Sequence, residues 1–191
     1  MVKKTKFFQI IKTIFPIVLV LFVIVTGLNY IKSQTNGEQG GGPSSYSLKE
    51  EMGLDDFFLF PVGEQAKVSF STLKGRIFFV NFWASWCSAC IIEMPSIVKL
   101  GKKFKNEGLE IISINVDENP ENIVPRFIKK FDMQFNVYKD EKGMLSQLFN
   151  VHAIPLTVIM DSNRKVLYIE TGDRDWSSEA VITQVKRWLA L

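Results

Sequence analysis

The chain has 191 residues, enough for one ordinary domain and an additional segment. Hydrophobic residues make up 47% of it, which is typical of a globular protein and excludes a disordered one. Residues 1–47 contain five lysines and one glutamate, a net charge of +4, so the remainder carries −1 of the total +3. A near-neutral main domain argues against nucleic acid as a partner, because nucleic-acid-binding domains present a basic face.

The N-terminal segment has the pattern of a membrane anchor. Residues 13–30 contain no ionisable group except Tyr30, and four lysines precede this run while Lys32 alone follows closely. The length is near the lower limit for a spanning helix, and the positive-inside tendency places the basic end in the cytoplasm. We therefore predict a cytoplasmic segment over 1–12, a transmembrane anchor over 13–31, and the rest of the chain on the outer, extracytoplasmic or periplasmic side of the cytoplasmic membrane.

A cleavable signal peptide is the alternative interpretation of this segment. Val25-Thr26-Gly27 offers a weak small-residue cleavage site, although no A-x-A sequence follows the apolar run. No cysteine follows the run directly, which excludes a lipoprotein anchor. Residues 32–47 are rich in Gly and Ser and predict a flexible linker, so we expect the folded domain to span residues 48–191.

Hydrophobic patterning within the domain predicts alternating strands and helices. The run at 77–83 is almost continuously apolar, as in a strand that is buried on both faces of a sheet. Further strands are expected near 67–70, 109–116, 135–138, 157–160 and 166–169, and helices near 87–105, 120–131, 144–149 and 177–189. Asn119 and Ser177 or Ser178 are the expected helix caps. This order predicts an α/β domain with a mixed sheet and helices on both faces.

The two cysteines, Cys87 and Cys90, are the only ones in the chain and stand at the junction of a predicted strand and helix. A thiol at a helix N-terminus has a lowered pKa, because free backbone N–H groups and the helix dipole stabilise the thiolate. Cys90, three residues further on, is close enough to form a disulfide with it. Half of a zinc site is the first alternative, but one histidine and no second cysteine pair cannot complete it. A pair of inert buried thiols is the second alternative.

Several motifs together resemble the TlpA/ResA/CcmG group of thioredoxin-like proteins, with an AhpC/TSA–Redoxin-like thioredoxin domain. They cover roughly residues 55–191: LKG at 73–75, FWASWCSAC at 82–90, EMP at 93–95, VDE at 116–118, VHAIP at 151–155, Gly172, and DW at 175–176. The resemblance implies a thioredoxin fold, with a central mixed sheet, flanking helices and an N-terminal strand or hairpin extension.

The resemblance also implies roles for single residues. Cys87 would be the attacking thiol and Cys90 the resolving one, and Glu93 would be a catalytic residue that assists proton transfer. Trp86 would shield the disulfide, and Ile154 with Pro155 would form a cis-proline loop that binds substrate backbone. Three further positions are notable: Pro95 would kink the active-site helix, and Asn81 replaces the buried aspartate of cytoplasmic thioredoxins. His152 is expected to be an ordinary, partly exposed side chain.

Two positions depart from the pattern of the group. Ala89 stands between the cysteines where proline is usual, and Leu156 stands after Pro155 where threonine is usual. The first departure bears on the redox potential, and the second on the loop that faces the substrate.

The function that the resemblance implies is that of a membrane-anchored, extracytoplasmic thiol–disulfide oxidoreductase. It would reduce disulfides of exported proteins, among them apocytochrome c during cytochrome c maturation, with electrons from a membrane or extracytoplasmic donor. The Cys87–Cys90 pair is itself the redox centre, so no cofactor or metal is expected.

Three alternatives remain. A thiol peroxidase would need Thr or Ser three residues before Cys87 and a proline four residues earlier still, where this chain has Ala84 and Val80. A tethered copper carrier would use cysteines separated by three residues rather than two. A non-enzymatic interaction module is the third.

Overall fold

A computed structural model of the chain describes residues 56–190. The predicted cytoplasmic segment, anchor and linker, and the start of the domain at residue 48, lie outside these described residues. Within residues 56–190, no helix has both the length and the apolar character needed to cross a membrane.

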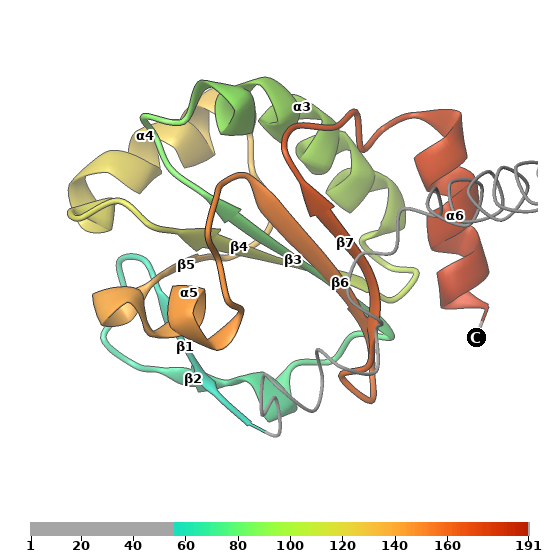
Figure 1. Cartoon of the computed structure of the whole chain (residues 1–191), viewed down its shortest axis with the longest axis horizontal. Helices are drawn as coiled ribbons and strands as arrows, with labels where there is room; N and C mark the ends of the chain where they lie inside the picture. Colours follow the sequence, from blue (N-terminus) through green and yellow to red (C-terminus); the bar gives the residue numbers. More distant parts are fainter. Residues whose placement is uncertain (1–55, 191) are drawn as a thin grey trace, which may run out of the picture. The chain divides into compact units, whose positions relative to one another are not determined.

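A seven-stranded mixed sheet forms the centre of the domain (Figure 1). Its strand order is β2-β1-β5-β4-β3-β6-β7, so the first two strands lie at one side of the sheet and the last strand forms the opposite edge. β3 lies parallel to β4, with Asn81 opposite Ser113, and antiparallel to β6, with Asn81 opposite Thr157. The strands are β1 (Phe58–Pro61), β2 (Val68–Ser69), β3 (Ile77–Trp83), β4 (Leu109–Asn115), β5 (Val137–Lys139), β6 (Leu156–Asp161) and β7 (Val166–Thr171).

Helices cover both faces of this sheet, as the sequence predicts. They are α3 (Ser88–Phe104), α4 (Pro120–Phe131), α5 (Met144–Leu148) and α6 (Glu179–Leu189), with short 3₁₀ turns η1 (Phe70–Thr72) and η2 (Glu141–Gly143). Ile77 and Phe79 of β3 pack with residues of α3 and α6, and Trp83 at the end of β3 packs with residues of α3 and α4. Phe78 and Phe82 face the other way, toward the α5 side. α3, α4 and α6 therefore share one face (Figure 1).

β3 is the strand that positions the site. All seven of its residues are buried, which explains the unbroken apolar run in the sequence. Asn81 is its only residue with a polar aliphatic side chain, and it lies on the same face as Phe79 and Trp83, since alternate residues of a strand point to the same side. A strand buried on both faces thus delivers one amide into the interior directly beneath α3.

The elements expected from the sequence are confirmed, with differences at their ends. β5 begins two residues later than expected, and only Val68–Ser69 of the 67–70 segment forms a strand, because the chain turns into η1. The predicted N-terminal extension is present as β1 and β2, which pair antiparallel with each other. Asn119 and Ser178 precede α4 and α6 as expected, but neither side chain makes a capping hydrogen bond.

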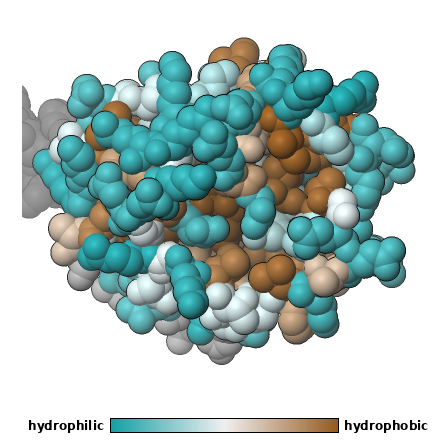
Figure 2. Space-filling model, turned by 180° about the vertical axis from the view of Figure 1, so that it is seen from behind, coloured by the Kyte–Doolittle hydropathy of each residue, from teal (hydrophilic) through white to brown (hydrophobic). Residues whose placement is uncertain are grey.

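Seen from the side opposite to Figure 1, the domain surface is largely hydrophilic, with apolar residues showing in patches between polar ones (Figure 2). Four large hydrophobic side chains of the described region are exposed: Phe58, Trp86, Ile92 and Met144. Trp86 adjoins Cys87 in the chain, and Ile92 lies two residues after Cys90. Two of the four therefore belong to the segment that carries the cysteines.

Candidate active site

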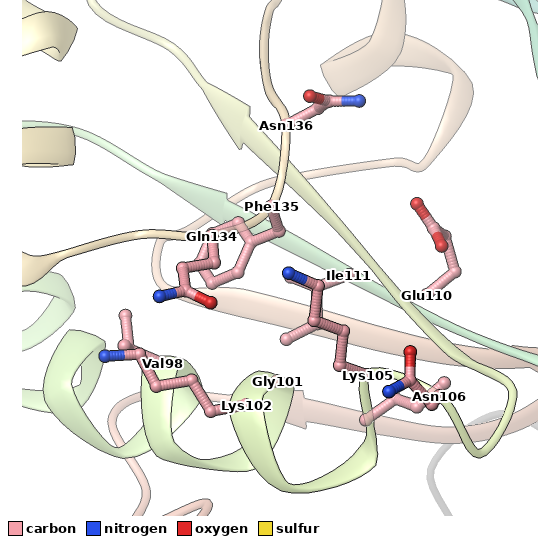
Figure 3. Close-up of a pocket in the computed structure, with 11 residues that line it drawn as sticks. Val98, Gly101, Lys102, Lys105, Asn106, Glu110, Ile111, Gln134, Phe135 and Asn136 are labelled. Atoms are coloured by element: carbon pink, nitrogen blue, oxygen red, sulfur yellow. The ribbon is translucent and has the colours of Figure 1, made fainter.

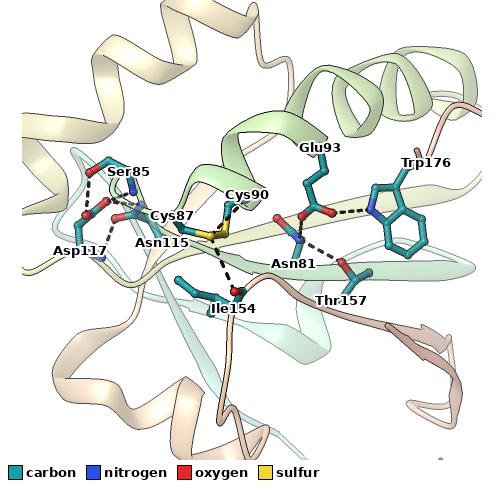
Figure 4. The surroundings of a disulfide bond; sticks show 10 residues. All are labelled: Asn81, Ser85, Cys87, Cys90, Glu93, Asn115, Asp117, Ile154, Thr157 and Trp176. Atoms are coloured by element: carbon teal, nitrogen blue, oxygen red, sulfur yellow. Dashed lines mark hydrogen bonds between the residues drawn. A yellow bond between two sulfur atoms is a disulfide. The ribbon is translucent and has the colours of Figure 1, made fainter. Parts of the chain in front are cut away.

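The two cysteines lie at the start of α3 and are joined by a disulfide (Figure 4). Cys87 is the N-cap residue, with an extended backbone, and Cys90 lies in the first helical turn. Cys87 keeps 7% of its surface exposed, whereas Cys90 is completely buried. This difference agrees with the predicted roles, because an attacking sulfur must be reached from outside and a resolving sulfur need not be.

Cys87 Sγ accepts a hydrogen bond from the backbone N–H of Cys90, over 3.2 Å. The sulfur thus occupies the place that a Ser or Asp oxygen fills at many helix N-termini. When the disulfide is reduced, the same N–H and the helix dipole are positioned to stabilise a thiolate at Cys87. The donor is the amide of Cys90 rather than that of Ala89, which bears on how residue 89 can tune the sulfur.

A polar cluster fixes the loop between β3 and the cysteines. Asp117 accepts hydrogen bonds from the Ser85 backbone N–H and from the Ser85 hydroxyl, each over 2.9 Å. The side-chain amide of Asn115 donates to the same carboxylate over 2.8 Å. The backbone N–H of Val116 donates to the Trp83 carbonyl over 3.0 Å. The end of β4 therefore holds the loop that precedes Cys87 from both its backbone and its side chains.

The segment before β6 faces the disulfide. The peptide bond between Ile154 and Pro155 is cis, as the resemblance implies, and the Ile154 carbonyl oxygen lies 3.8 Å from Cys87 Sγ. A disulfide sulfur carries no proton, so this is a contact in the oxidised chain that a Cys87 thiol can turn into a weak hydrogen bond. The Pro155 carbonyl accepts the N–H of Gly172, which ties this loop to the end of β7.

Glu93 is buried beneath α3, with 2% of its surface exposed. One carboxylate oxygen, Oε1, accepts from the side-chain amide of Asn81, and the other, Oε2, accepts from the indole N–H of Trp176, each over 3.0 Å. Burial is the largest influence on this carboxyl group and raises its pKa, while the two N–H donors act in the opposite direction. Figure 4 shows the carboxylate turned toward Asn81 and Trp176.

Ser96 secures the Trp176 side of this arrangement. Its hydroxyl donates to the Glu93 carbonyl over 2.7 Å and accepts the backbone N–H of Trp176 over 3.0 Å. Trp176 is itself 1% exposed and packs edge-on against Phe79 of β3. The segment between β7 and α6 is therefore locked onto α3 at the position of Glu93.

The structure brings together most of the residues that the sequence singles out. The Cys87–Cys90 disulfide lies against the Ile154–Pro155 loop through the contact of Cys87 with Ile154. Glu93 lies deeper, in contact with Asn81. Trp86 is 69% exposed, so its ring projects from the protein beside Cys87, and its predicted shielding role stays a prediction. α3 continues through Pro95, and His152 is exposed.

Thr157, Trp176 and Asp117 are among the residues of the site that received no role from the sequence. Trp176 and Asp117 stand in motifs that carry the family resemblance, but nothing in the sequence indicates that Trp176 reaches Glu93 across 83 positions. Thr157 follows from strand pairing, since it lies opposite Asn81 and accepts from its amide over 3.0 Å. Polar residues within buried strands are the signal that could have identified Thr157.

A second polar region lies at the far end of α3, where a pocket opens between α3, β4 and the segment before β5 (Figure 3). Lys102 of α3 and Lys105, which directly follows α3, line it together with Glu110 of β4 and Gln134. Burial raises the pKa of Glu110 and is the only cause of that shift. Among residues 56–190, no group of three or more His, Cys, Asp or Glu side chains is arranged to hold a metal ion.

Comparison with known sequences places this geometry among thioredoxin-like proteins. The sequence profile of the Redoxin family matches residues 57–185. The thiol-disulfide oxidoreductase ResA of Bacillus thuringiensis is 33% identical over 111 residues, which are 58% of this chain and 64% of ResA. The ResA of Bacillus subtilis is 33% identical over 106 residues, covering 56% of this chain and 59% of ResA. The match thus spans about three fifths of the length of these relatives.

Comparison with solved structures gives the same fold. A thiol:disulfide interchange protein of the thioredoxin family from Chlorobium tepidum has a TM-score of 0.60 at 27% identity, covering 70% of this chain and 93% of that structure. StoA from Bacillus subtilis has a TM-score of 0.55 at 21% identity, covering 70% and 95%, and supports the fold alone. The chain therefore belongs to the Redoxin family, and its likeness to the TlpA/ResA/CcmG group of thioredoxin-like proteins is confirmed.

Proposed function

We propose that the protein is a thiol–disulfide oxidoreductase that reduces disulfides of other proteins outside the cytoplasmic membrane. The observation that carries this proposal is the Cys87–Cys90 pair at the N-terminus of α3, with Cys87 partly exposed and facing the Ile154–Pro155 loop. The relatives that match are named thiol-disulfide oxidoreductases. An inert pair of thiols would need neither the partial exposure of Cys87 nor its helix N-terminus.

The reaction uses the two sulfurs in sequence. The Cys87 thiolate attacks one sulfur of the substrate disulfide, and the other substrate sulfur leaves as a thiolate. Cys90 then loses its proton and attacks Cys87 Sγ, which breaks the mixed disulfide and releases the second substrate thiolate. Two electrons have passed to the substrate, and the protein is left with the Cys87–Cys90 disulfide. A membrane or extracytoplasmic dithiol donor must return the two electrons.

The location and substrate rest on the sequence. The uncharged run at residues 13–30, preceded by lysines, favours a single-pass anchor with the domain on the outer side. Exported proteins with disulfides, including apocytochrome c, are the substrate class that this location and the family likeness support. Labelling of cysteine variants in intact cells with a membrane-impermeant thiol reagent tests the location, since a cytoplasmic domain would stay unlabelled until the cells are lysed.

Reduction of insulin by the dithiothreitol-reduced protein tests the activity. The wild type should precipitate the insulin chains, and Cys87→Ser should match the rate without enzyme. An active Cys87→Ser protein would exclude the proposed attacking thiol, and an inactive wild type would favour the non-enzymatic interaction module. A Cys90→Ser variant should hold substrates as mixed disulfides, whose identification by mass spectrometry tests the substrate class.

A further inference from the structure

The buried amide of Asn81 has one satisfied end and one unsatisfied end. Its nitrogen donates to Glu93 Oε1 and to Thr157 Oγ1, each over 3.0 Å. Its oxygen, Oδ1, is the one buried side-chain polar atom recorded without a hydrogen-bond partner in residues 56–190. Asn81 is 1% exposed, so bulk water does not reach this oxygen. A buried acceptor without a donor is costly, and its persistence calls for a state in which a donor is present.

The orientation of the amide identifies that donor. Figure 4 shows Asn81 below α3, between the cysteines and Glu93, with its nitrogen on the side of Glu93 and Thr157 and its oxygen turned to the side of the disulfide. Cys90 points into the same interior and is completely buried. In the oxidised chain neither sulfur carries hydrogen, so the disulfide has nothing to donate. Reduction of the disulfide creates one new donor in this interior, the Cys90 thiol.

We propose that Asn81 Oδ1 accepts a hydrogen bond from the Cys90 thiol in the reduced protein, which makes Asn81 a positioning residue for the resolving sulfur. The proposal rests on the proposed function, because it concerns the reduced state from which Cys87 attacks. Reduction of the disulfide then takes up two electrons and one proton. The S–S bond breaks, the proton is held on Cys90 by Asn81, and Cys87 is left as a thiolate beside the Cys90 N–H.

An amide is suited to this task because it does not titrate. A carboxylate at position 81 would compete for the Cys90 proton, whereas the Asn81 oxygen accepts the hydrogen bond and leaves the proton on the sulfur. The contact with Glu93 strengthens the effect, because a donor already bound to a buried carboxylate is polarised and leaves its amide oxygen a better acceptor. Asn81 also favours the reduced state over the disulfide, since its oxygen is satisfied only after reduction.

The S–H stretching band in the infrared spectrum tests the contact directly. The chain has two cysteines, so Cys87→Ala leaves Cys90 as the only source of this band. In the folded Cys87→Ala protein the band should lie at lower frequency than in the same protein unfolded in urea, as expected for a hydrogen-bonded thiol. A band at the same frequency in the folded and unfolded protein would overturn the proposal, and this test leaves Asn81 itself unaltered.

Replacement of the amide identifies the acceptor. Asn81→Leu in the Cys87→Ala background should move the band back to the frequency of a free thiol. Ser113→Ala is the matched control. It removes a buried hydroxyl of the neighbouring strand β4, and this hydroxyl accepts its hydrogen bond from Trp83 Nε1. The S–H band should therefore stay in place in Ser113→Ala. If the band stays at the lower frequency in Asn81→Leu, the Cys90 thiol donates to another acceptor, such as a buried water, and the assignment to Asn81 is overturned.

The equilibrium with glutathione gives a second, independent measure in the protein with both cysteines. Asn81→Leu should shift this equilibrium toward the disulfide by about tenfold, equivalent to a potential about 30 mV more reducing. An unchanged equilibrium, or a shift toward the dithiol, would refute the preference of Asn81 for the reduced state. Insulin reduction separates the two proposals: an active wild type with an unshifted S–H band would refute the role of Asn81 and leave the proposed function intact.

Discussion

Two glutamates near opposite ends of α3, Glu93 within the helix and Glu110 in β4, have a pKa that is raised by burial, but their surroundings differ. At the N-terminal end, Glu93 is almost fully buried, and each of its carboxylate oxygens accepts one N–H hydrogen bond. At the C-terminal end, Glu110 lines an open pocket with Lys102 and Lys105, and burial is the only recorded influence on its pKa. A raised pKa alone therefore does not distinguish a functional carboxyl group from an ordinary one.

Connection to the reacting atoms makes the difference. Glu93 is linked through Asn81 to the strand beneath the disulfide and through Trp176 to the segment before α6. Donors from two distant parts of the chain hold its carboxylate in one orientation. Glu110 has no comparable links, so its environment reflects its place beneath the end of a helix. We expect changes at the N-terminal end of α3 to affect electron transfer, and changes at the C-terminal end to affect stability alone.

The largest expected difference between the two ends is in disulfide reduction by Cys87→Ser and Lys102→Ala. Cys87→Ser removes the attacking sulfur and should reduce the rate of insulin reduction to background. Lys102→Ala removes a surface ion pair with Asp132, worth at most about 1 kcal/mol, and should keep the wild-type rate. A loss of activity in Lys102→Ala without loss of folding, followed by circular dichroism, would show that the far end of α3 also takes part.

The glutamates themselves provide the next comparison. Glu93→Gln should slow thiol–disulfide exchange by roughly a hundredfold, the lower limit of the range for a group that assists proton transfer. It should also change the pH dependence of the rate, because a titrating group has been replaced by one that does not titrate. Stopped-flow measurements of exchange with a small disulfide between pH 5 and 9 test both effects.

Glu110→Gln is the matched control, since it makes the same chemical change in β4, beside the other end of α3. Its rate and pH profile should follow those of the wild type. If both variants behave alike, the connection of Glu93 through Asn81 has no kinetic consequence, and the predicted catalytic role of Glu93 fails.

The sequence is sufficient to predict the elements of this fold because each long strand and helix has its own hydrophobic period. β3 is the clearest case, since its unbroken apolar run matches a strand buried on both faces. The cysteine pair is predictable as well, because it stands between a strand and a helix. β5 and β2 are only three and two residues long, and their limits depend on pairing with neighbours that the local pattern does not reveal.

The contacts around Glu93 cannot be predicted from local sequence patterns. Glu93 and Trp176 are 83 positions apart, and their hydrogen bond follows from the way the segment after β7 folds back over α3. The sequence predicts that a carboxylate one turn after Cys90 interacts with the thiols. The structure instead directs that carboxylate to Asn81 and Trp176, so any influence on the sulfurs acts through the amide of Asn81.

A smaller effect is expected in the pH dependence of stability. A carboxyl group whose pKa is higher in the folded than in the unfolded protein binds more protons when folded, so its contribution to stability falls as pH rises. Relative to Glu93→Gln, the wild type should lose stability as pH rises from about 4.3, the ordinary glutamate value, through the raised pKa. Urea unfolding of both oxidised proteins between pH 4 and 8 measures this slope.

The stability difference between the wild type and Glu110→Gln should change less with pH, because Glu110 is only partly buried and solvent screens its charge. The sign must nevertheless be the same, since burial raises both pKa values. A wild type that gains stability relative to either variant over this range would contradict the raised pKa at that position.

The smallest expected effect is that of Ala89→Pro on the redox potential. Residue 89 lies in the first turn of α3, where proline is tolerated, so the fold should be preserved. Proline removes one N–H from the group of amides near Cys87 Sγ, which weakens the stabilisation of the thiolate and hence of the reduced state. The hydrogen bond from the Cys90 N–H is the direct one, however, and it survives the substitution. The wild type should therefore be more oxidising than Ala89→Pro, but by less than about 30 mV, a tenfold change in equilibrium.

Equilibration with thiol buffers of known potential measures this difference, and Ser88→Ala, which keeps every backbone amide, should match the wild type. A wild type more reducing than Ala89→Pro would refute the role of the amides, and a wild-type potential near −120 mV, about that of a dedicated oxidant, would refute the proposed direction of electron flow.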